Sequence, residues 1–234
     1  YLSGIILNQG DRIMIDKMVG KTEVALYGLA YSIGMLVQLF ISGMNSALTP
    51  WMYSKIKKGD IRSMRKVLQL LSIVVVGIAV ALMLISPELV LIFGSPKYRE
   101  AVYVIPPVAA SVFFIFIYNI LSMPQFYYEK TQFLMAASMA AAGANVVLNF
   151  IFIRLFGYIA AGYTTLACYM LYSVGHYIVS KRILVNEGIQ ENLMNPGFLL
   201  ACSVFLIGAS IICNLIFPYR ILRYAILLAS AGLV

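Results

Sequence analysis

Charged residues are scarce in this sequence of 234 residues. They make up 11% of it, whereas soluble domains average about a quarter. Hydrophobic residues account for 62% and gather in long runs. This composition argues against a water-soluble enzyme, a disordered tail or a disulfide scaffold, and it is typical of a protein that crosses a membrane several times.

Residue types that hold metals or perform catalysis are also rare. Cys168, Cys202 and Cys213 lie inside apolar runs without the spacing of metal ligands, and His176 is the only histidine. The sequence has no Ser/His/Asp arrangement, no carboxylate pair in a polar loop and no glycine loop that would bind phosphate. We therefore expect no catalytic residues, no bound metal and no cofactor, and we predict that the protein is not an enzyme.

Eight apolar segments have lengths that suit membrane-spanning helices. They cover residues 2–19, 24–49, 67–86, 101–123, 132–153, 158–180, 197–217 and 221–234. Open strands cannot satisfy their backbone hydrogen bonds in lipid, so the sequence predicts an all-α integral membrane protein with about eight transmembrane helices. The first residue is Tyr1 and the last apolar segment is too short to cross. We therefore expect a piece of a longer protein whose final span is truncated.

The net charge is +8. We interpret the excess of Lys and Arg as a sign of how the chain is oriented in the membrane, and not as a sign of a nucleic-acid partner. In so apolar a sequence, excess Lys and Arg flank membrane spans on the cytoplasmic side. The strongest basic cluster, SKIKKGDIRSMRK at residues 54–66, is therefore expected in the cytoplasm. Because successive spans alternate in direction, residues 127–131 and 181–195 are expected on the same side.

Polar residues within the predicted spans are the candidates for a binding site. In the first span, Asn8, Asp11 and Arg12 share one helical face, and Asp11 and Arg12 are expected near mid-membrane. A charge at that depth is costly and usually faces the interior of a bundle, on the path of a substrate or ion. An internal salt bridge or a hydrogen-bonded contact between helices is the structural alternative.

The other candidates lie one or two to a span. Gln38 and Asn45 are in the second span, Asn119 in the fourth, Asn149 in the fifth and His176 in the sixth. Gln38 and Asn45 could join helices through hydrogen bonds or share a cavity with Arg12. His176 could shuttle protons or lie at the membrane interface, near the cytoplasmic end of its span.

Four strings of the sequence resemble the polysaccharide-export family of Wzx-type O-antigen flippases. They are DRIMIDKMVGKTEVALYGLAYSIGMLVQL, PWMYSKIKKGD with its basic loop, YVIPPVAASVFFIFIYNILSMPQFYYEKT and NFIFIRLFGYIAAGYTTLACYMLY. That family shares a superfamily with multidrug exporters of the MATE type and with the lipid II flippase. The resemblance covers most of residues 1–183 and implies that these form the second lobe of a MATE-like fold of two six-helix lobes. Residues 184–196 would be a cytoplasmic linker, and residues 197–234 two additional spans.

The same resemblance implies a flippase that moves undecaprenyl-pyrophosphate-linked sugar repeat units across the bacterial inner membrane. The implied partners are this lipid-linked oligosaccharide, membrane lipids, an N-terminal lobe of the same protein, and the polysaccharide polymerase and export machinery. Arg12 would then offer a charge-assisted contact to the pyrophosphate. A multidrug exporter of the same fold is the first alternative, although it should place unpaired carboxylates in its cavity. A membrane-embedded enzyme of glycan assembly is the second, although the sequence lacks a catalytic loop.

Overall fold

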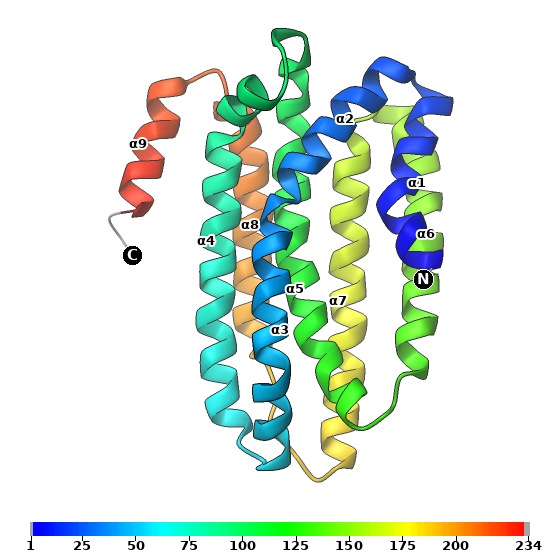
Figure 1. Ribbon diagram of the computed structural model, residues 1–234, viewed down its shortest axis with the longest axis vertical. Helices are drawn as coiled ribbons and strands as arrows, with labels where there is room; N and C mark the ends of the chain where they lie inside the picture. Colours follow the sequence, from blue (N-terminus) through cyan, green and yellow to red (C-terminus); the bar gives the residue numbers. More distant parts are fainter. Residues whose placement is uncertain (1, 232–234) are drawn as a thin grey trace.

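The computed structural model describes residues 2–231, with side chains for residues 9–227, and this part of the chain contains helices and no strands. The helices are α1 (Leu2–Met18), α2 (Lys21–Gly34), α3 (Leu36–Lys57), α4 (Ile61–Phe93), the 3-10 helix η1 (Pro96–Val104), α5 (Ile105–Tyr127), α6 (Gln132–Phe156), α7 (Ala160–Asn186), α8 (Pro196–Ile216) and α9 (Arg220–Ala231). Most of them stand side by side in one bundle (Figure 1). The all-α prediction is confirmed.

Helix α5 is the core of the bundle because almost all of its side chains are apolar and nearly all are buried. It packs against α3, α4, α7 and α8, while α1 packs against α6 at one edge. Pro106 and Pro107 occupy the first turn of α5, where proline costs no hydrogen bond. The predicted span 101–123 therefore starts in η1, and these prolines begin α5.

Five segments of the described chain are long and apolar enough to cross a membrane: Lys21–Lys57, Ile61–Phe93, Pro96–Tyr127, Gln132–Phe156 and Pro196–Ile216. This is fewer than the eight predicted spans. Helix α1 carries four charged residues among its 17, and the described part of α9 has only 12 residues. Helix α7 is long enough, but it mixes polar residues into its apolar sequence and buries them against α5 and α6.

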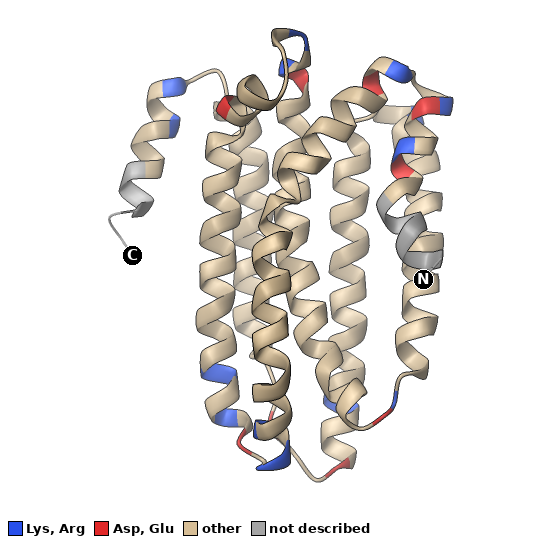
Figure 2. Ribbon diagram, viewed as in Figure 1, with Lys and Arg blue, Asp and Glu red and all other residues tan. Residues whose placement is uncertain are grey.

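The three loops predicted to share one side of the membrane do lie together. They are at the lower end of the bundle in Figure 1, and Figure 2 shows Lys and Arg at this end as well as at the upper end. Arg65 at the start of α4 pairs with Glu191 (Nη2–Oε2 3.5 Å), and Lys130 pairs with Glu187 (Nζ–Oε1 3.4 Å). These ion pairs connect the loops before α4, α6 and α8. Their location in the cytoplasm stays a prediction.

Candidate functional site

Asp11 is the centre of a buried polar cluster in the upper part of the bundle. Its carboxylate is fully buried and accepts three hydrogen bonds from three other helices. The Tyr27 hydroxyl of α2 donates at 2.6 Å, the Asn149 amide of α6 at 2.5 Å and the Thr165 hydroxyl of α7 at 2.9 Å. Both carboxylate oxygens are therefore occupied by uncharged donors, as a buried charge requires.

A second layer of hydrogen bonds fixes these donors in place. Asn149 also donates to the Asn145 side-chain oxygen at 3.1 Å, and it accepts a hydrogen bond from the Thr164 hydroxyl. Asn145 and Asn149 are one helical turn apart, so both point from α6 toward α7. The cluster thereby joins α1, α2, α6 and α7 through side chains that are all buried.

The sequence placed Asp11 near the middle of the membrane, whereas the structure places it closer to the upper end of the bundle. Its partner Asn149 is seven residues from the end of α6, and Thr165 is five residues from the start of α7. At 1.5 Å per residue, the carboxylate lies roughly 10 Å below those helix ends. The difference arises because α1 packs along the upper part of α6 (Figure 1).

The cluster is closed by its own hydrogen bonds. The Asn149 amide and the Thr165 hydroxyl donate to the Asp11 carboxylate, and the Asn145 oxygen accepts from Asn149, so these groups are not left free as ligands for a hard cation. Groups of three or more His, Cys, Asp or Glu that could hold a metal ion are absent from the described residues. A soft-metal centre of Cys and His ligands therefore has no counterpart in this part of the chain.

Arg12 does not pair with its neighbour Asp11 in the described structure. Its Nη1 donates to the Gln9 side-chain oxygen at 3.2 Å, and its guanidinium carbon lies 5.5 Å from the centre of the Tyr31 ring. Its Nε is buried without a hydrogen-bond partner among the described residues. Adjacent helical residues point about 100° apart, which explains why the carboxylate of Asp11 turns to other helices and leaves the guanidinium without a carboxylate partner. Asn8 lies outside the described side chains.

His176 belongs to a separate buried site lower in the bundle. Its side chain is fully buried, with Nδ1 at 2.7 Å from the Gln125 amide nitrogen and the rings of Tyr172 and Phe133 at 4.5 and 5.5 Å. The ring is buried by neighbouring helices, whereas its depth in the membrane stays a prediction. On α7, His176 follows Thr165 by eleven residues, or roughly 16 Å, so the structure does not bring it together with Asp11.

The remaining candidates are on α3 and α5. Gln38 and Asn45 of α3 have side-chain oxygens that are buried and without partners in the described part of the chain. Asn119 of α5 is partly buried. The seven predicted residues with described side chains therefore lie in separate places, and among these places only the Asp11 cluster contains a buried carboxylate.

Sequence reasoning did not single out Tyr27 or Gln125. Tyr27 lies one turn before Tyr31 on the buried face of α2, and nothing in its spacing distinguishes it from a packing residue. Gln125 follows Pro124 at the end of an almost wholly apolar helix. A buried glutamine in such a helix requires a partner, and this signal could have linked it to the lone histidine.

Comparison with known proteins places this helical bundle in a family. The profile of the MatE family matches residues 5–151, which covers α1 to α5 and most of α6, including Asp11, Arg12 and Asn149. The chain belongs to the MatE family. Members of this family are membrane transporters, and the MatE domain and the five apolar helices together show a multi-pass membrane protein.

Two relatives of this MatE chain come from Haemophilus influenzae. An uncharacterized membrane protein is 31% identical over 134 residues, which are 54% of this chain and 32% of that protein. A protein named Lsg locus putative protein 1 is 28% identical over 147 residues, which are 59% of this chain and 35% of that protein. The matched part thus spans about a third of the length of these relatives. No solved structure matches the chain.

Proposed function

We propose that this MatE chain is part of a flippase that moves undecaprenyl-pyrophosphate-linked oligosaccharide repeat units across the bacterial inner membrane for surface polysaccharide biosynthesis. A lipid with a pyrophosphate-sugar head group cannot carry that head through hydrocarbon unaided. A polar cavity between two lobes would shelter the head while the polyprenyl tail stays in lipid, and rocking of the lobes would re-expose it outside. In this proposal the second lobe is formed by residues 1–183 and the other by an N-terminal part of the full-length protein.

The observation that carries the proposal is the charge balance around Arg12. The Asp11 carboxylate uses both oxygens on Tyr27, Asn149 and Thr165, so in the described structure it forms no ion pair with the neighbouring guanidinium. Arg12 keeps a buried Nε without a partner and a planar set of donors suited to a bidentate contact with phosphate. Among the described residues the site therefore offers a guanidinium without a carboxylate partner and a carboxylate already occupied by uncharged donors, which favours an anionic head group.

The pairing of these charged groups also argues against the two alternatives, a multidrug exporter and an enzyme of glycan assembly. An exporter of cationic drugs needs a free carboxylate. The carboxylate within the first span and the one beside Pro87 near a span end are both occupied, because Asp11 accepts three hydrogen bonds and Glu88 pairs with Arg223. An enzyme of glycan assembly needs catalytic groups beside the sugar, and the sequence has no Ser/His/Asp arrangement and no carboxylate pair in a polar loop to supply them.

Reconstituted transport distinguishes these functions. The full-length protein would be placed in lipid vesicles with fluorescently labelled lipid-linked repeat units, and the label on the outer leaflet would be quenched over time. The proposal predicts protein-dependent movement of the labelled lipid and no uptake of a cationic dye. Dye transport without movement of the lipid would support the multidrug exporter, and covalent change of the glycan would support the enzyme.

A further inference from the structure

Two side-chain amide oxygens of α3 have no hydrogen-bond partner among the described residues. The oxygens of Gln38 and Asn45 are shielded from solvent and accept no hydrogen bond there, and Asn119 is a partly buried residue of α5. A buried amide oxygen without a donor is costly. Side-chain amides that only join helices would accept hydrogen bonds from one another or from the backbone, and the oxygens of Gln38 and Asn45 accept none from the described residues.

Two contacts fix the register of α3 against α5 and place Asn45 level with Asn119. The Thr49 hydroxyl approaches the Met123 sulfur at 3.7 Å, and the rings of Tyr53 and Tyr127 are 5.4 Å apart. Both pairs are separated by 74 positions in the chain, and the helices run in the same direction (Figure 1). The next pair one turn higher, again 74 positions apart, is Asn45 and Asn119.

The surroundings of these amides are polar but carry no charge. Residues 24–54, which hold most of α2 and α3, include no Asp, Glu, Lys, Arg or His. The hydroxyls of Ser42 and Ser46 already donate to backbone oxygens of their own helix, so their oxygens remain as acceptors. An amide presents donors and an acceptor side by side, which complements the paired hydroxyl groups of a sugar ring and gives no advantage to a phosphate.

We infer that Gln38, Asn45 and Asn119 form a subsite for neutral sugar residues of the transported head group. The inference rests on the proposed flippase function and assigns the two ends of the head group to different places. The pyrophosphate binds at Arg12, beside Tyr31, and the sugars extend along α3 toward the lower end of the bundle. Gln38 and Asn45 are seven residues apart on α3, or about 10 Å, and Tyr31 lies on α2 just before the helix break at Met35, so the row suits an extended oligosaccharide.

Binding of two lipids to the full-length protein in lipid nanodiscs tests this assignment. One is undecaprenyl pyrophosphate without sugar, and the other is the lipid-linked repeat unit extracted from the strain that encodes the chain. Asn45→Leu and Asn119→Leu replace each amide by an apolar group of the same branched shape. Each should weaken binding of the sugar-bearing lipid about five- to tenfold, because each loses one or two uncharged hydrogen bonds, and should leave binding of the bare lipid unchanged.

Two further variants separate this result from a general defect. Ser203→Ala on α8, whose hydroxyl only bonds to the backbone of its own helix, should bind both lipids normally, and Asn45→Ser should show an intermediate loss. Equal losses for both lipids, or no loss for either, would overturn the sugar subsite. If the unmodified protein bound neither lipid, the proposed function itself would fail.

Discussion

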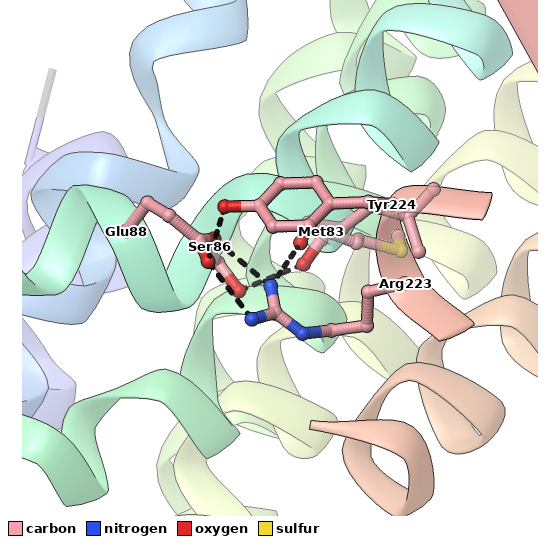
Figure 3. A network of polar contacts seen from close by, with 6 residues as sticks. Met83, Ser86, Glu88, Arg223 and Tyr224 are labelled. Carbon is pink, nitrogen blue, oxygen red and sulfur yellow. Dashed lines mark hydrogen bonds and ion pairs between the residues drawn. The ribbon is translucent and has the colours of Figure 1, made fainter. Parts of the chain in front are cut away.

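Glu88 and Arg223, which are 135 residues apart in the chain, form a two-point ion pair that holds α9 against α4 (Figure 3). The two guanidinium nitrogens lie 2.9 and 2.8 Å from the two carboxylate oxygens, and Tyr224 donates to the same carboxylate at 2.9 Å. Arg223 also donates to the Leu84 backbone oxygen at 2.7 Å.

Because Pro87 lacks an N–H, the Met83 carbonyl has no helical donor, and the Ser86 hydroxyl donates a hydrogen bond to it instead.

Breaking this ion pair should detach α9. The Arg223 side chain is only 4% exposed and the Glu88 side chain 27%, so Arg223→Met should lower the free energy of unfolding by about 2 kcal/mol, between typical surface and fully buried pairs. Glu88→Gln should cause a similar loss, and the two together less than the sum. Thermal unfolding in detergent measures these changes. Strict additivity would show that the two residues do not stabilise α9 together.

Removal of the Asp11 carboxylate should destabilise the bundle. Asp11→Leu leaves the buried donors of Tyr27, Asn149 and Thr165 without an acceptor. We expect a loss of about 3 kcal/mol, since each unsatisfied buried group costs about 1–3 kcal/mol before relaxation. Asp16→Asn, an exposed change on the same helix, is the control and should be neutral. Equal thermal unfolding of the two variants would contradict a structural role for the cluster.

The lower end of α4 should loosen in acid. Asp60 accepts a hydrogen bond from the Ser63 backbone N–H and pairs with Lys55 (2.6 Å), and the hydrogen bond from Lys55 lowers the pKa of the Asp60 carboxyl below its ordinary value of 3.8. Because the pKa of Asp60 is lower in the folded protein than in the unfolded chain, the ionised carboxylate stabilises the fold above pH 3.8. This stabilisation is lost as the pH falls through the pKa of the folded state. Hydrogen exchange of the first turn of α4 should therefore accelerate in that range. Asp60→Ala should show fast exchange already at pH 7, and identical exchange in both proteins would contradict the cap.

The orientation of the chain can be read from cysteine labelling. Lys58 in the α3–α4 loop and Lys97 in η1 are both exposed and lie at opposite ends of the bundle. In a protein whose three natural cysteines are replaced by serine or alanine, an impermeant thiol reagent outside intact cells should label Lys97→Cys and spare Lys58→Cys, because the basic loop stays in the cytoplasm. The reverse pattern would invert the predicted topology.

The sequence predicted the helices well because each long apolar run has one stable form in a membrane. It also identified Asp11 and Asn149 as candidates, since polar residues stand out against so apolar a background. It could not show that they touch, because their contact joins helices that are 138 positions apart. The depth of Asp11 and the burial of His176 likewise depend on how α1 and α5 pack, and the pattern within a single helix does not contain that information.

Surface polysaccharide export by Arg12 variants tests the central claim most directly. The full-length protein would be expressed in a flippase-deficient strain, with membrane levels of each variant matched to the unmodified protein. Because Arg12 is held by Gln9 and Tyr31 and not by Asp11, its loss should remove the anion contact and spare the buried cluster. Arg12→Ala should nearly abolish export, and Arg12→Lys, which keeps the charge without the planar donors, should reduce it partly. Near-normal export by Arg12→Ala would contradict the pyrophosphate contact and assign Arg12 a structural role.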